Sequence, residues 1–174
     1  MNDQVLIAGI GNIFLGDDGF GCELARLLSS RSLPSGVKVM DFGIRGFDLA
    51  FALLDPWRVV VLIDALPRGG AAGTLYLVEP DLAAIPAASS QDSVDAHSMD
   101  PVKVLQLAAM MGKVSCKIYL LGCEPEDCGG EEGSMGLSPV VAAAIPEALC
   151  MIDELVARIF EKDIPAVTEN SLTR

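Results

Sequence analysis

Short apolar runs alternate along the chain with segments of helical periodicity. The run at 58–65 is the clearest, because it is apolar and rich in β-branched residues, and it predicts a central strand that is covered on both faces. The run at 73–80 alternates between apolar and polar residues and predicts an edge strand. The remaining strands are expected at 5–10, 36–43 and 116–123.

Helices are expected between these strands. After the first strand, apolar residues recur on one face of a helix that begins near Phe20. A later helix has Asp100 as its N-cap, Pro101 at its first position and Gly112 as its stop signal. Two further helices are expected at 47–54 and from Ser138 toward Phe160.

Strands that alternate with helices predict a three-layer α/β/α fold with a central, mainly parallel twisted sheet of about five strands. We expect one domain over 1–164 and a flexible tail at 165–174. In a sheet of this kind the ligand site lies beyond the carboxyl ends of the strands. Unusual residues at strand ends are therefore the first candidates for function.

The composition of the chain restricts the kinds of molecule that it is expected to bind. The chain has 174 residues, of which 51% are apolar, and a net charge of −12, which disfavours nucleic acid and anionic membranes. Five cysteines at irregular spacing favour reduced thiols, and we find neither a signal peptide nor an apolar run of about 18 residues. We therefore expect a cytoplasmic protein, and no long amphipathic seam is left over, so we expect a monomer.

A glycine-rich loop follows the first strand and reads GIGNIFLGDDGFG at 9–21. The dinucleotide fingerprint requires glycine where Phe14 stands, and a phosphate-binding P-loop requires Lys and Ser or Thr where Asp17 and Asp18 stand. Two carboxylates would repel a phosphate. The loop therefore disfavours nucleotide binding, which stays the least favoured alternative.

Four residues carry possible chemistry. Asp17 and Asp18 either complement the dipole of the following helix or hold a cation. Asp64 emerges at the carboxyl end of the third strand, where a turn-forming aspartate is the simpler interpretation. His97 is the only histidine and lies just before the helix that Asp100 caps.

Together, Asp18, Asp64 and His97 could form a site for a divalent ion such as nickel, zinc, manganese or iron. The alternative is a carboxylate–imidazole acid–base pair without a metal. The residues alone do not choose between these. No separate nucleophile is evident, because any cysteine would have to use His97 as its base, so water is the candidate attacking group.

Three motifs, GIGNIFLGDDGFG, LIDA and DAHSMDP, occur in an order and spacing that resemble the nickel–iron hydrogenase maturation endopeptidases. The segments DFGIRGFDL, LGCEPED and MGLSPVVAAAIP also resemble this family. The resemblance implies an enzyme that removes a C-terminal extension from the hydrogenase large-subunit precursor after nickel insertion. It also implies that the relevant ion is the precursor's nickel, although another divalent metal can occupy the site.

The resemblance assigns metal binding and catalysis to Asp18, Asp64 and His97, with Asp17 as the second choice for the first ligand. The family commonly has Glu where this chain has Asp18. Where the family has adjacent glycines and Thr, this chain has Gly43, Arg45 and Gly46, and we expect these residues and Asp17 to contact the substrate. A chaperone that senses nickel on the precursor without cutting it is the main alternative.

Overall fold

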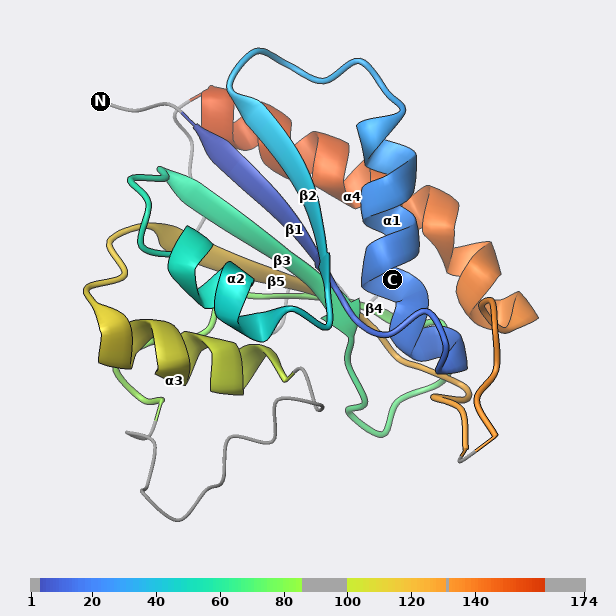
Figure 1. The fold of residues 1–174 in the computed structure, drawn as a ribbon. Helices are drawn as coiled ribbons and strands as arrows, with labels where there is room; N and C mark the ends of the chain where they lie inside the picture. The colour runs from blue at the N-terminus through green and yellow to red at the C-terminus, as the bar shows by residue number, and fades with distance from the viewer. Residues whose placement is uncertain (1–3, 86–99, 131, 162–174) are drawn as a thin grey trace.

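The computed structural model describes residues 4–85, 100–130 and 132–161 (Figure 1). Its sheet has the strand order β2-β1-β3-β5-β4, in which β4 pairs antiparallel with β5 and the other pairs are parallel. This confirms the predicted mainly parallel sheet of five strands. The strands are β1 (Val5–Ile10), β2 (Val37–Gly43), β3 (Val59–Ala65), β4 (Leu75–Val78) and β5 (Lys117–Cys123).

Helices cover both faces of the sheet and complete the predicted three layers. Helices α1 and α4 pack on one face, and α2 and α3 pack on the other (Figure 1). The helix bounds are α1 (Phe20–Ser29), α2 (Gly46–Ala52), α3 (Pro101–Met111) and α4 (Pro139–Phe160), and a short 3-10 helix, η1 (Gly16–Gly19), precedes α1.

Strand β3 lies in the middle of the sheet and divides the apolar core in two. Val59, Val61 and Ile63 face α1 and α4, whereas Val60 and Leu62 face α2 and α3. Every residue of β3 is buried. The continuous apolar run therefore forms the central strand that the sequence predicts, and the alternating run forms the edge strand β4.

The predicted helix caps are present. The Oδ1 atom of Asp100 accepts a hydrogen bond from Val102 N at 2.8 Å at the start of α3, which ends at Gly112. The Oγ atom of Ser138 accepts from Val141 N at 3.4 Å at the start of α4. Each side chain satisfies a backbone N–H group that has no partner within its helix.

The glycines of the loop after β1 allow α1 to approach the sheet closely. A Cβ atom on Gly21 would lie 2.1 Å from Ile63 O and 2.2 Å from Ile10 O. A Cβ atom on Gly9 would lie 2.4 Å from Gly21 O. The glycines thus serve contact between backbones, and the first turn of α1 is fixed against the ends of β1 and β3.

Two predictions lie outside the described residues, namely the position of His97 and the flexible tail at 165–174. Within the ranges that the structure describes, every helix is too short or too polar to cross a bilayer.

Candidate active site

Asp64 lies at the carboxyl end of the central strand. It is the sixth residue of β3 and only 3% exposed. Its Oδ1 atom accepts a hydrogen bond from Ala65 N at 2.9 Å. A carboxylate this deeply buried is costly to ionise without a compensating charge. A residue that only formed a turn would not need such burial.

Asp18 approaches the same edge from η1. Its Oδ2 atom accepts a hydrogen bond from Asn12 N at 2.7 Å, which fixes the side chain within the glycine loop. Burial raises the pKa of Asp18, and the hydrogen bond from Asn12 opposes this effect. Asp18 is therefore held in place while its charge is only partly compensated.

The two carboxylates act on each other. Burial raises the pKa of Asp64 well above its usual value, and the negative charge of Asp18 raises it further, followed by that of Asp100. The contact of Gly21 with Ile63 explains this proximity, because these residues are close neighbours of Asp18 and Asp64 in the chain. Because each carboxylate disfavours the charge of the other, a nearby cation would favour the ionised form of both.

Asp17 faces the interior. It is 1% exposed, and its two carboxylate oxygens accept hydrogen bonds from Glu126 N at 2.9 Å, Asp127 N at 3.0 Å, Ser138 N at 2.7 Å and Ser138 Oγ at 2.9 Å. Burial alone would raise the pKa of Asp17, but these hydrogen bonds lower it below its usual value. The carboxylate is fully engaged, so this geometry does not support the predicted substrate contact and leaves Asp18 as the acid beside Asp64.

The segment after β2 borders the glycine loop. Gly43 O accepts a hydrogen bond from Gly11 N at 3.1 Å, and Gly43 has a φ of 54°, which favours glycine. The guanidinium of Arg45 donates to the carbonyls of Asp41 and Phe42, and Gly46 begins α2. This arrangement places Arg45 near the carboxyl ends of the strands, where the sequence predicts substrate contacts.

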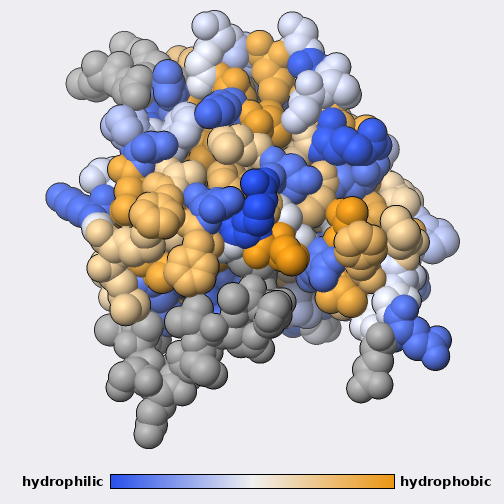
Figure 2. All heavy atoms as spheres, in the orientation of Figure 1, coloured by the Kyte–Doolittle hydropathy of each residue, from blue (hydrophilic) through white to orange (hydrophobic). Residues whose placement is uncertain are grey.

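Apolar side chains are exposed beside this segment. Ile44, Phe47 and Phe51 are 48%, 50% and 60% exposed. Figure 2 shows apolar and polar areas alternating on this face of the molecule.

A family model described as hydrogenase maturation protease matches residues 22–154. This chain belongs to the hydrogenase maturation protease family. It is 31% identical to the hydrogenase expression/formation protein HupD of Rhodobacter capsulatus over 175 residues, which cover 98% of this chain and 80% of the relative. It is therefore a peptidase.

Solved structures agree with this family. The hydrogenase 2 maturation peptidase from Thaumarchaeota archaeon SCGC_AB-539-E09 is 31% identical, with a TM-score of 0.67 over 88% of this chain and 98% of that one. An endopeptidase from Escherichia coli is 25% identical, with a TM-score of 0.71 over 89% and 92%. The predicted family, fold and enzyme class are confirmed.

Cys22 is surrounded by the acids of this peptidase. Burial raises the pKa of its thiol to about 12, and Asp41, Asp64 and Asp18 contribute to the rise. The Sγ atom donates a hydrogen bond to Gly11 O at 3.4 Å. A thiol that stays protonated at neutral pH is a poor nucleophile, which favours water as the attacking group.

The other cysteines differ in exposure. Cys123 is the last residue of β5 and is buried, whereas Cys150 is exposed on α4. The position of a cysteine within its strand or helix decides whether its side chain points to the core or to solvent.

The protease also contains a buried acid that sequence reasoning missed. Glu124 follows β5 and is 5% exposed. Its Oε2 atom accepts hydrogen bonds from Arg68 N and Tyr76 Oη, both at 2.9 Å, and its Oε1 atom accepts from Gly69 N at 3.0 Å. Glu124 thus fixes the loop that follows Asp64. Glu124 stands in the segment LGCEPED, but the segment does not reveal this role, because the partners of Glu124 lie about 50 positions away in the sequence.

Within the described ranges, no group of three or more His, Cys, Asp and Glu side chains is arranged to hold a metal ion. Asp18 and Asp64 supply two oxygen donors, which suit a hard or borderline divalent ion. A third donor has to come from elsewhere, and His97 lies outside the described residues.

Proposed function

We propose that this protease is a metal-dependent endopeptidase that removes the C-terminal extension of the nickel–iron hydrogenase large-subunit precursor after nickel insertion. The observation that carries this proposal is the pair of carboxylates, Asp18 and Asp64, whose mutual repulsion a cation would relieve. The family membership supports the peptidase chemistry and the large-subunit precursor as substrate.

His97 is the proposed third ligand. Asp100, three residues after His97, is close enough to Asp64 for its charge to raise the pKa of that carboxyl group. The chain therefore passes near Asp64 at Asp100, shortly after His97 in the sequence, which supports His97 as a ligand. Two carboxylates and one imidazole suit nickel, and they also suit zinc, manganese or iron.

The ion is proposed to arrive with the substrate. Asp18, Asp64 and His97 would then coordinate the nickel that is bound to the precursor. The enzyme would therefore act on nickel-loaded precursor. When bound, such an ion polarises a carbonyl group or lowers the pKa of a water molecule. Asp18 and Asp64 would orient it, because hydrogen bonds from Asn12 and Ala65 fix both side chains.

The setting of this reaction is also proposed. We infer a cytoplasmic monomer that contacts neither nucleic acid nor membrane, in keeping with the net charge of −12. An acidic surface suits a partner that presents a metal ion.

Mass spectrometry of the precursor tests the function. Nickel-loaded precursor should lose a C-terminal peptide when the protease is added, and nickel-free precursor should keep its full mass. His97→Ala and Asp64→Ala should each abolish this loss without changing the circular dichroism spectrum. Normal processing by either variant would contradict the proposed site. Binding of the wild-type protein to the precursor without a change in the precursor's mass would favour a chaperone.

A further inference from the structure

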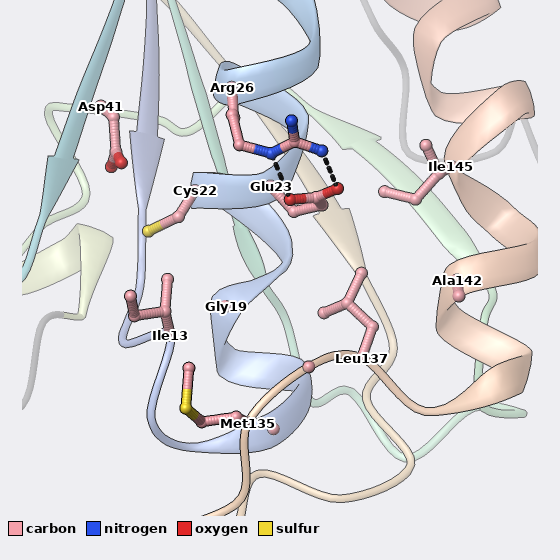
Figure 3. Close-up of a pocket in the computed structure, with 12 residues that line it drawn as sticks. Ile13, Gly19, Cys22, Glu23, Arg26, Asp41, Met135, Leu137, Ala142 and Ile145 are labelled. Carbon is pink, nitrogen blue, oxygen red and sulfur yellow. Dashed lines mark hydrogen bonds and ion pairs between the residues drawn. The ribbon is translucent and has the colours of Figure 1, made fainter.

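A groove of about 630 Å³ extends over the beginning of α1, from the side of Asp41 in β2 to the beginning of α4. Figure 3 shows Ile13, Cys22 and Asp41 on one side of α1, and Leu137 and Ala142 on the side that faces α4. Its apolar lining is completed by Met135 and Ile145. We call this feature the α1–α4 groove.

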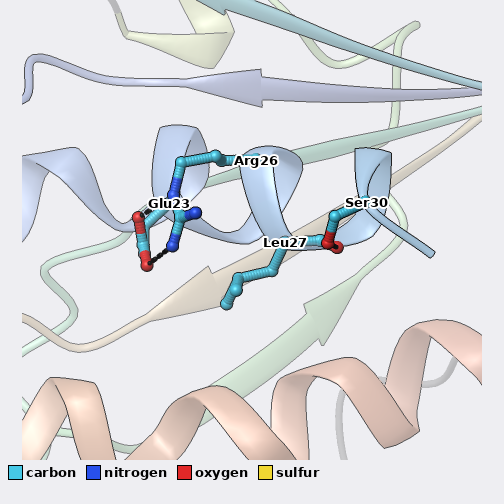
Figure 4. Close-up of polar contacts among 4 residues, drawn as sticks. All are labelled: Glu23, Arg26, Leu27 and Ser30. Atoms are coloured by element: carbon cyan, nitrogen blue, oxygen red, sulfur yellow. Dashed lines mark hydrogen bonds and ion pairs between the residues drawn. The ribbon is translucent and has the colours of Figure 1, made fainter.

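The charged residues at the middle of the groove compensate each other. Arg26 donates two hydrogen bonds to Glu23, from Nε at 2.8 Å and from Nη2 at 2.6 Å (Figure 4). This bidentate pair leaves no net charge between the apolar walls. The remaining charge of the lining is Asp41 of β2.

The groove borders the loop that carries Asp18. Gly16 and Gly19, the first and last residues of η1, line it together with Cys22, and Asp18 precedes Gly19 directly. A chain that occupies the groove would therefore pass beside the loop that holds Asp18. Apolar side chains of that chain would be stabilised in the groove, because they leave water there.

We propose that the α1–α4 groove binds an apolar segment of the precursor's C-terminal extension in extended form. This inference rests on the proposed function. The extension suits the groove because it must be reachable as a chain end if it is to be cut off, whereas the surface of a folded domain does not enter a concave channel. The apolar lining favours an apolar segment, because Glu23 and Arg26 are paired with each other, and Gly16 and Gly19 bring the groove to the loop that carries Asp18.

Two neighbouring alanines of α4 provide a matched test. Both are exposed, but Ala142 lines the groove and Ala143 does not. Ala142→Trp should raise the KM for nickel-loaded precursor about tenfold, equivalent to 1.4 kcal/mol, with kcat little changed. Ala143→Trp should process like the wild type. Thermal unfolding checks that both variants fold, and Met135→Ala removes part of the wall without adding bulk and should also raise KM.

Photo-crosslinking identifies the occupant. A benzophenone amino acid at position 142, mixed with nickel-free precursor, should crosslink to the C-terminal extension, and the same group at 143 should not. Equal crosslinking from both positions, or crosslinks from 142 to the body of the precursor, would overturn the inference, as would wild-type kinetics for Ala142→Trp. Failure of the wild type to shorten nickel-loaded precursor contradicts the proposed function instead, and the crosslinking result is independent of cleavage.

Discussion

Asp17 and Asp18 are adjacent in the sequence, but their carboxylates serve different parts of the molecule. Asp17 accepts hydrogen bonds from the loop after β5 and from the start of α4, whereas Asp18 accepts from Asn12 and acts on Asp64. The tandem acids are therefore one anchor and one proposed metal ligand. The anchor holds η1 in place, and with it the side chain that the proposed reaction needs.

Replacing the anchor should destabilise the protein. Asp17→Asn removes the charge and places an amide N–H₂ group against backbone donors, so we expect the free energy of unfolding to fall by roughly 1.5–3 kcal/mol. Urea unfolding at pH 7 measures this change. The control is Asp55→Asn at an exposed position, which should stay within about 0.5 kcal/mol of the wild type.

The stability difference between the wild type and Asp17→Asn should depend on pH. The pKa of Asp17 is lowered in the folded protein, so its stabilising contribution is present above its usual value of 3.8 and is lost as the pH falls through the folded pKa. The difference between wild type and Asp17→Asn should thus be full at pH 7 and shrink below about pH 4. A difference that stays constant across this range would exclude a role for the ionised carboxylate.

The contribution of Asp64 to stability should depend on pH in the opposite direction. Its folded pKa is raised, so its contribution to stability is present below the unfolded value and is lost as the pH rises through the folded pKa. Without metal, Asp64→Asn should be more stable than the wild type at high pH, by about 2–4 °C in Tm for each kcal/mol gained, and similar to it near pH 4. Processing should be lost. A variant that unfolds below the wild type throughout would contradict this prediction.

The length of the acid at position 18 can be tested separately from its charge. Asp18→Glu restores the residue that the family commonly has and should keep measurable processing. Asp18→Asn keeps the size of the side chain but removes its charge, and should lower kcat/KM by more than about 100-fold. Equal activity of Asp18→Asn and wild type in the mass-spectrometric assay would show that the charge is unnecessary.

Arg45 is expected to influence the choice of precursor. Its guanidinium binds the carbonyls of Asp41 and Phe42 and lies 3.5 Å from the carboxylate of Asp48, so it forms a fixed positive group at the edge of the site. Arg45→Thr should change the ratio of kcat/KM between two large-subunit precursors by about fivefold, equivalent to roughly 1 kcal/mol. Competition between the precursors in one reaction measures the ratio, and an unchanged ratio would contradict the role.

The fold was predictable because its signals are local. The apolar run of β3 requires burial on both faces, and Asp100 and Ser138 mark helix starts through hydrogen bonds that span only a few residues. The proximity of Asp18 and Asp64 followed from the rule that parallel strands present their carboxyl ends at one edge.

The long-range roles were not predictable in this way. Asp17 binds residues 109 to 121 positions away, and Glu124 binds residues about 50 positions away, so no spacing along the chain announces either contact. The glycines of the loop also have a purpose that composition does not reveal. Gly9 and Gly21 permit contact between α1 and the sheet, not the approach of a phosphate.

The contact of Gly21 with Ile10 and Ile63 bears on how the ion preference of the proposed metal site could be redesigned. Because backbone meets backbone there, the two segments that carry Asp18 and Asp64 cannot slide relative to each other to suit a larger or smaller ion. Coordination radius is then adjustable only through the reach of the side chains. A change of ion preference would then exchange aspartate for glutamate at position 18 and leave the backbone contact unchanged.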